Sequence, residues 1–504
     1  MNRTQKFTLN TFTSAFAQVV AMATGFIVPR IMVYSYGSEM NGLISSLTQF
    51  VSYLTFVEAG LSGAAVYSLY KPLADNNTSA INRIITAARK YYLQAGYLFT
   101  TGLFILAIFF SWMKSSETIP VHVIFWLVIL LGVNGCSDFF VFARYRVLLT
   151  ADQRSYVISS VSIVQTIIRT CIICVFASPT FNVVFLYTLA LLPILIKFLF
   201  VIYYCKKNYD YLDTTNVTPD NAALSRRWDV IYQQILGIVQ TGAPTIIATV
   251  ILDFLSLSVL SIHNMIINGV NGVLSIFTSG LPAGFGEIIA KNEKNNLKKT
   301  VSEFEVAYYF ILSLIYGVTF VMMPSFIKLY TRGFTDTNYN YPMLVFIIIL
   351  NGLLYNIKTP QSMLIISAGM YKETRWRVTL QAIIIIALGS CLGLRFGLVG
   401  IIMGACLSNI YRTIDLIYFV PKYITNNNPL LSIRRMLQVL VNISLINIPL
   451  LWITMDPKNY IIWCLYAAGF VIYAFFIILL TTVLFDRKEF CSLIHRIKAM
   501  VLRR

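Results

Sequence analysis

Apolar stretches long enough to cross a membrane recur along the whole chain and are separated by short polar turns. A helix rises about 1.5 Å per residue, so roughly 20 apolar residues cross a hydrocarbon layer about 30 Å thick. The pattern predicts an all-α polytopic membrane protein with about 14 transmembrane helices. They are expected at residues 9–35, 41–70, 84–112, 121–146, 153–177, 182–205, 229–253, 257–288, 301–330, 341–370, 376–394, 397–420, 433–454 and 459–485.

Composition agrees with this pattern, because 57% of the residues are hydrophobic and only 12% are charged. The net charge of +18 would suggest nucleic-acid binding in a soluble protein. Here, however, the basic residues are concentrated in alternate loops between the predicted membrane helices. Of the 39 Lys and Arg, 29 lie at the termini or in even-numbered loops, 5 in odd-numbered loops and 5 within predicted helices. Positive loops face the cytoplasm, so both termini are predicted to be cytoplasmic and no nucleic-acid partner is expected.

A polar linker divides the chain into two similar halves. We predict an N-terminal six-helix bundle at 1–206, a cytoplasmic linker at 207–228, and a C-terminal six-helix bundle at 229–422. Residues 423–504 would add two helices and a basic tail. Since six crossings separate the halves, they would point the same way as pseudo-symmetric bundles with a substrate cavity between them.

A weak internal repeat supports this division. Shifting the chain by 220 residues aligns Gly60, Leu61, Lys71 and Asn76 with Gly280, Leu281, Lys291 and Asn296.

The segment from Phe56 to Asp75, FVEAGLSGAAVYSLYKPLAD, resembles a segment of Wzx-like polysaccharide repeat-unit flippases. That family belongs to the multidrug/oligosaccharidyl-lipid/polysaccharide exporter superfamily, so the resemblance implies two six-helix bundles around a cavity. It also implies alternating-access movement of undecaprenyl-diphosphate-linked oligosaccharides across the bacterial cytoplasmic membrane, for O-antigen, capsule or related polymers. Polysaccharide polymerases and glycosyltransferases would be the partners, besides membrane lipids. The first helix lacks the acidic pair that cation-coupled drug exporters of the superfamily use.

Basic residues within predicted helices are candidates for binding the diphosphate. A charge at the membrane centre costs at least about 2.5–3.5 kcal/mol, so each needs a partner, a watery cavity or a function. The candidates for a cationic substrate site are Lys358, Arg30, Arg169 and Lys197. Lys358 precedes Thr359-Pro360 near mid-depth, and Arg30 follows Pro29, which can kink a helix. The alternative is that Arg30, Arg169 and Lys197 extend toward lipid headgroups.

Two deep carboxylates, Glu58 and Asp138, are candidates for proton or sodium coupling. Pairing with embedded cations is the alternative, and the structural role that we favour for them. Arg412 and Asp415 stand three residues apart on one helical face, which predicts a self-contained ion pair.

Enzymatic chemistry is not indicated by the sequence. The three histidines, His122, His263 and His495, are far apart, and no catalytic triad, phosphate-binding glycine loop or metal motif is present. We therefore predict a transporter without catalytic residues, metal or cofactor. The leading hypothesis is a lipid-linked oligosaccharide flippase, and the alternatives are a cation-coupled small-molecule exporter of the same superfamily and, more remotely, a membrane glycosyltransferase or polymerase.

Overall fold

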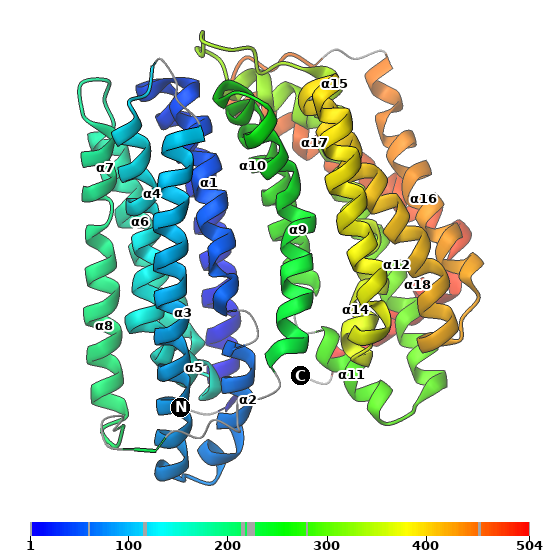
Figure 1. Ribbon diagram of the computed structural model, residues 1–504. Coiled ribbons are helices and arrows are strands. Elements are labelled where there is room, and N and C mark those ends of the chain that lie inside the picture. Colours follow the sequence, from blue (N-terminus) through cyan, green and yellow to red (C-terminus); the bar gives the residue numbers. More distant parts are fainter. Residues whose placement is uncertain are drawn as a thin grey trace. The chain divides into compact units, whose positions relative to one another are not determined.

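The computed structural model describes residues 3–58, 61–113, 118–212, 217–218, 227–278, 281–451 and 455–502. Every regular element within these ranges is helical, as Figure 1 shows, so the predicted all-α fold class is confirmed. The α-helices are α1 Arg3–Leu54, α2 Leu61–Ala74, α3 Thr78–Met113, α4 Val121–Ser137, α5 Ala143–Ala151, α6 Ser155–Phe176, α7 Val183–Leu189, α8 Leu192–Asn208, α9 Arg227–Ile251, α10 Phe254–Thr278, α11 Leu281–Ala290, α12 Lys294–Tyr330, α13 Pro342–Ile357, α14 Thr359–Ala368, α15 Tyr371–Val420, α16 Pro429–Asn447, α17 Tyr460–Phe485 and α18 Arg487–Leu502.

The helices account for the predicted number of crossings. In the described part of the chain, 11 helical segments are long and apolar enough to span a membrane. Two of them, Thr8–Glu58 and Tyr371–Thr425, have 51 and 55 residues, about twice the length that one crossing needs. The shorter apolar stretch Leu236–Ile251 of α9 corresponds to one further predicted crossing. The protein is therefore a multi-pass membrane protein.

Each of the two long segments is divided by a glycine. Gly37 in α1 has φ of +84°, and Gly397 in α15 has φ of +58° with ψ of −139°. Residues with a Cβ atom disfavour these conformations, whereas glycine adopts them readily. Glycine therefore permits the turn between two successive helices. The kink expected at Pro29 is not the main break in α1, because the non-helical backbone lies at Gly37 instead.

The chain forms two compact units. The first contains residues 1–249 and 253–258, and the second contains 250–252 and 259–504. Within the first unit, α1 packs against α6 and α3 packs against α4, while in the second α12 packs against α13, α16 and α17. The predicted division at 206, 228 and 422 stays a prediction, and linker residues 213–216 and 219–226 lie outside the described ranges.

The backbone repeats between the two halves of the sequence. Helices α2 and α11 begin at Leu61 and Leu281, which are 220 residues apart as in the sequence register. A positive-φ turn follows each of these helices, at Asn76 and Asn292 with φ of 50° and 55°. These two residues are 216 positions apart, because α11 with 10 residues is four residues shorter than α2 with 14. Similar local backbone at corresponding positions supports a duplicated helical pattern.

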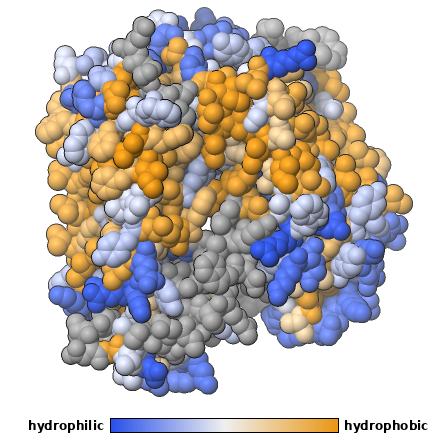
Figure 2. All heavy atoms as spheres, viewed as in Figure 1, coloured by the Kyte–Doolittle hydropathy of each residue, from blue (hydrophilic) through white to orange (hydrophobic). Residues whose placement is uncertain are grey.

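Side-chain polarity on the first unit follows the expectation for a membrane protein. On the blue and cyan helices of Figure 1, the face seen in Figure 2 is apolar over its middle and hydrophilic toward its ends. Large apolar side chains are exposed on α3 and α8, among them Phe104, Ile105, Ile108 and Leu199. Large exposed apolar residues in this number need hydrocarbon, and not water, as their solvent.

Candidate functional site

Lys358 lies at a break between two helices. Helix α13 ends at Ile357 and α14 begins at Thr359 with Pro360 in its first turn, so Lys358 is the residue at the junction. Proline lacks an amide hydrogen, which makes it compatible with a helix start but not with the continuation of α13. The charge and the interrupted backbone therefore coincide in one span, as the sequence predicts.

The partners of Lys358 are neutral. Its ammonium donates to Oδ1 of Asn409 at 2.6 Å and to the carbonyl oxygen of Tyr355 at 3.2 Å, and it lies 4.5 Å from the centre of the Tyr355 ring. The residue is only 5% exposed. No carboxylate pairs with Lys358 in the part of the chain that the structure describes. The positive charge of this side chain is therefore hydrogen-bonded but not neutralised.

Asn409 is held by a further amide. Its Nδ2 donates to Oδ1 of Asn351 at 3.0 Å, which directs Oδ1 of Asn409 to the Lys358 ammonium. One turn along α13, the Nδ2 of Asn356 donates to Oδ1 of Asn271 at 2.7 Å and contacts the Tyr316 hydroxyl at 2.9 Å. The α13–α14 junction thus lies among buried polar side chains that are hydrogen-bonded to one another. Such a network can offer the Lys358 ammonium other hydrogen-bond acceptors if the side chain moves.

Lys197 is placed differently, because it forms an ion pair. Its ammonium is 3.0 Å from Oδ1 of Asp138 and 4.3 Å from the centre of the Phe142 ring. Asp138 begins a π-helical turn, Asp138–Phe142, between α4 and α5. A π-helical turn shifts the side chains that follow it, and such turns are frequent at functional sites. The pairing that we favoured for Asp138 is present, and the coupling role of Asp138 and the substrate role of Lys197 stay predictions.

Asp138 and Lys358 stand at the same irregularity of the two halves, in the fourth predicted span of each. The helices that follow, α5 and α14, begin at Ala143 and Thr359, which are 216 residues apart. Lys358 therefore corresponds to Phe142, four residues after Asp138. The two halves carry charges of opposite sign at this irregularity, but not at the same position.

Glu58 is also paired. It ends the short 3-10 helix Thr55–Glu58, forms an ion pair with Arg146 of α5, and accepts a hydrogen bond from the Tyr92 hydroxyl at 3.4 Å. The predicted span ends at residue 146, whereas the helical segment continues to Ala151, so Arg146 lies inside the segment and not at its end. Arg146 is an embedded cation that was not among the candidates named from the sequence.

The remaining predicted cations lie on the first unit. Arg30 is half-buried within α1, and Arg169 is half-buried within α6. Arg169 lines a small cavity of about 20 Å³. This volume accepts a water or a monatomic ion but not a diphosphate. A substrate contact of Arg169 stays a prediction.

The predicted ion pair between Arg412 and Asp415 is confirmed. Nη1 of Arg412 is 2.6 Å from Oδ2 of Asp415, and Arg377 pairs with the other oxygen. This cluster therefore carries a net positive charge. Together with Lys358 and Arg169, it leaves the charge of these embedded residues basic after Glu58 and Asp138 have been paired.

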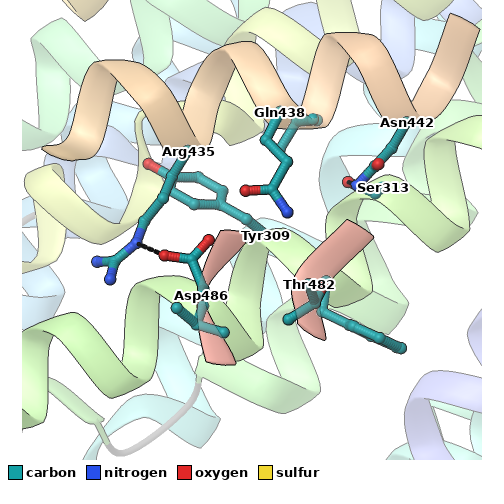
Figure 3. A pocket seen from close by; sticks show the side chains of 10 residues that line it. Tyr309, Ser313, Arg435, Gln438, Asn442, Thr482 and Asp486 are labelled. Atoms are coloured by element: carbon teal, nitrogen blue, oxygen red, sulfur yellow. Dashed lines mark hydrogen bonds and ion pairs between the residues drawn. The ribbon is translucent and has the colours of Figure 1, made fainter. Parts of the chain in front are cut away.

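A buried charge network in the second unit was missed by the sequence analysis. Arg435 of α16 is 2% exposed and pairs with Glu305 of α12 at 2.9 Å, with Asp486 at 3.1 Å and with Glu489 at 3.3 Å. Figure 3 shows Arg435, Gln438 and Asn442 along one helix, with Asp486 and Thr482 facing them. The network joins α12 to the three last helices.

The same network reaches the helix that carries Lys358. Gln361 of α14 donates to Oε1 of Glu305 at 2.9 Å, and Ser432 donates to the same oxygen at 2.9 Å. The carboxylate of Glu305 therefore connects α14 with α16 through two hydrogen bonds and one ion pair.

A local signal could have revealed Arg435. Helix α16 begins at Pro429, and Oδ1 of Asn428 accepts a hydrogen bond from the Leu430 amide at 3.0 Å. An asparagine cap followed by proline is a recognisable helix start. Placing the start there, four residues before 433, puts Arg435 two turns inside the helix.

A second polar cluster joins helix ends of the first unit. Asp152 accepts from Lys6 at 2.9 Å and from the Tyr209 hydroxyl at 2.6 Å, and lies 2.7 Å from Arg154. Burial and the hydrogen bond to Asp152 both raise the pKa of Tyr209 above its ordinary value. The cluster ties the start of α1 to the α5–α6 turn and the end of α8.

Comparisons with known proteins give the fold. No family model and no curated protein matches the chain. Among solved structures, the lipid II flippase MurJ in an inward closed conformation matches with a TM-score of 0.68 at 13% identity, over 95% of this chain and 99% of that protein. An inward-facing multidrug resistance MATE family transporter of the MOP superfamily matches with a TM-score of 0.64 at 14% identity, over 85% and 95%.

The chain has the fold of MOP superfamily transporters. A third similar structure, a MATE protein in complex with MaL6, has a TM-score of 0.58 at 12% identity over 86% of this chain. At these identities the likeness shows the fold, and the MOP fold is the superfamily architecture expected from the sequence. The Wzx-like family within it stays a prediction.

Proposed function

We propose that this MOP-fold protein is a flippase that moves undecaprenyl-diphosphate-linked oligosaccharide repeat units from the inner to the outer leaflet of a bacterial cytoplasmic membrane. The cycle would use alternating access, with both termini cytoplasmic, and would supply O-antigen, capsule or a related polymer. Polysaccharide polymerases and glycosyltransferases would be its partners.

The observation that carries the proposal is the uncompensated charge of Lys358. Its partners are Asn409 and Tyr355, whereas the deep carboxylates Glu58 and Asp138 are already paired with cations. A buried cation with neutral partners can exchange them for a diphosphate oxygen, and a charge-assisted hydrogen bond is stronger than a neutral one. An organic cation would instead need an unpaired carboxylate.

Exposure of Lys358 is part of the proposed cycle. The side chain is only 5% exposed, so the α13–α14 junction must move before a substrate can reach it. Helix breaks next to proline are places where such movement is inexpensive. The resemblance of the segment from Phe56 to Asp75 to Wzx-like flippases, and the fold shared with a lipid II flippase, favour the lipid-linked substrate.

Transport in proteoliposomes tests the proposal. Labelled undecaprenyl-diphosphate oligosaccharides would be incorporated, and outward movement scored by accessibility to a glycan-cleaving enzyme. We expect Lys358→Met to reduce movement at least about tenfold, which corresponds to about 1.4 kcal/mol. Lys328→Met is the matched control, since Lys328 is an exposed lysine at the end of α12 in the same unit.

The alternative function is tested in the same vesicles. A cation-coupled exporter would move a fluorescent organic cation in response to a proton or sodium gradient and leave the glycan in place. Movement of the organic cation alone, or equal glycan movement by wild type and Lys358→Met, contradicts the proposal.

A further inference from the structure

The cavity beside Arg169 has the chemistry of a small-anion site and is too small for the diphosphate of the proposed substrate. It lies inside the first unit among α4, α6, α7 and α8 and has a volume of about 20 Å³. Its polar lining consists of Asn134, Gln165, Arg169 and Tyr187, and the rest of the lining is aliphatic. None of the lining residues is acidic.

Arg169 is embedded in the membrane. It lies seven residues before the end of α6 at Phe176, which is about 10 Å along the helix axis. Its guanidinium has no hydrogen bond or ion pair with any residue in the described part of the chain. A charge in this position costs at least about 2.5–3.5 kcal/mol unless something compensates it. No carboxylate among the described residues lines the cavity to do so.

The other polar groups at the cavity are mainly donors. Nε2 of Gln165 donates to Oδ1 of Asn134 at 3.3 Å, so the carbonyl oxygen of Asn134 is already used and its Nδ2 remains available. Tyr187 is 4% exposed, interacts electrostatically with Arg169, and makes no hydrogen bond through its hydroxyl to another described residue. Because Tyr187 lines the cavity, its hydroxyl can donate to an acceptor placed there.

The geometry points to a small monovalent anion, chloride in a cell, bound between Arg169, Tyr187 and Asn134. A monatomic anion is close to water in size and fits a cavity of about 20 Å³. It accepts hydrogen bonds from all three donors and neutralises the guanidinium. A water in the same place would accept at most two of these bonds and would leave the charge uncompensated.

Salt-dependent stability tests the site without any transport assay. The purified protein in lipid nanodiscs would be unfolded thermally in sodium chloride and in sodium gluconate at equal ionic strength, which keeps charge screening constant. Gluconate is too large for the cavity. We expect the unfolding midpoint to rise with chloride and saturate, because a ligand that binds only the folded state stabilises it.

Variants identify the binding residues. Arg169→Gln should abolish the chloride response, and Tyr187→Phe should raise the half-saturating chloride concentration roughly tenfold, the equivalent of about 1.4 kcal/mol for one charge-assisted hydrogen bond. Arg30→Gln is the control, since Arg30 is also a half-buried arginine of the first unit but does not line the cavity. Its chloride response should equal that of the wild type.

Bromide provides a direct readout if Arg169→Gln does not fold. Crystals of the wild type grown in bromide should show an anomalous peak bounded by Arg169, Tyr187 and Asn134, and the peak should weaken in Tyr187→Phe. Equal midpoints of the wild type in chloride and gluconate, an undiminished response of Arg169→Gln, or no anomalous peak at the cavity would each overturn the assignment. Failure of glycan transport leaves these measurements unaffected, so the two proposals are separable.

Discussion

The ammonium of Lys197 lies 3.0 Å from Oδ1 of Asp138, and both side chains are embedded in the first unit. The partner of Lys358 at the equivalent irregularity of the other half is Asn409, at 2.6 Å. Both lysines are largely buried, with 6% and 5% exposure. The two sites therefore differ in whether removal of the lysine leaves an unpaired carboxylate, and this difference gives opposite predictions for stability.

Lys197→Met should destabilise the first unit. The substitution leaves Asp138 without its cation, and removing one partner of an embedded pair costs more than the pair itself contributes. Since Asp138 is 27% exposed in its side chain, we expect a loss of about 2 kcal/mol, seen as a lower thermal unfolding midpoint.

The double variant Asp138→Asn with Lys197→Met is the control for that prediction. It removes both charges, so the midpoint should recover most of the loss. A double variant as unstable as Lys197→Met alone would mean that the lysine acts through packing on Phe142, which lies 4.3 Å from its ammonium, and not through the carboxylate.

Arg435→Met should have a larger effect on the second unit. Arg435 is 2% exposed and faces Glu305, Asp486 and Glu489, so the substitution leaves two buried carboxylates with fewer partners. Breaking a buried network in this way costs about 3–5 kcal/mol. Proteolysis of the C-terminal helices should accelerate together with the fall in the unfolding midpoint.

Lys488→Met, an exposed position at the start of α18, is the matched control for Arg435→Met. Surface positions without partners usually change stability by less than about 0.5 kcal/mol. Equal stability of the two variants would contradict a structural role for the Arg435 network.

The membrane helices could be predicted because their signal is length and apolarity alone. Every predicted span has a helix in the structure, and the break between Ile357 and Thr359 lies beside the proline seen in the sequence, Pro360. The embedded lysine at residue 358 could be found for the same reason, since a charge within an apolar run needs no knowledge of its neighbours.

Helix ends and pairings could not be predicted in the same way. Arg146 and Arg435 stand at or near the predicted span ends at 146 and 433, and the helices extend beyond these ends, so neither was recognised as an embedded cation. Pairing is also a long-range property: Glu58 meets Arg146 across 88 residues and Arg435 meets Glu305 across 130. Hydropathy along the chain contains no information about which spans are neighbours.

Gly397→Ala should destabilise the turn within α15. The backbone at Gly397 has φ of +58° and ψ of −139°, a region that is open almost only to glycine. The expected cost is about 1–3 kcal/mol, measured as a lower unfolding midpoint. Gly25→Ala is the control, because Gly25 is helical and a methyl group there meets no atom within 4 Å. An unchanged midpoint for Gly397→Ala would contradict the turn.

Asp152→Asn should loosen the helix ends that meet at this residue. The carboxylate pairs with Lys6 and Arg154 and accepts from Tyr209, so the amide would lose both ion pairs. We expect a loss of about 1–2 kcal/mol and faster hydrogen exchange at the start of α1. Glu287→Gln should change stability by less than about 0.5 kcal/mol, because its pair with Lys291 is exposed.

Lys358→Met should separate transport from stability. No carboxylate of the described chain depends on this lysine, and its hydrogen-bond partners Asn409 and Tyr355 can rearrange, so removal of the buried charge should leave the unfolding midpoint unchanged or raise it. Glycan movement should nevertheless fall at least about tenfold if the ammonium binds the diphosphate. Lys197→Met should instead lower the unfolding midpoint, because it leaves Asp138 without its cation. A Lys358→Met protein that loses transport only in proportion to its loss of folded protein would indicate a structural lysine and would remove it from the substrate route.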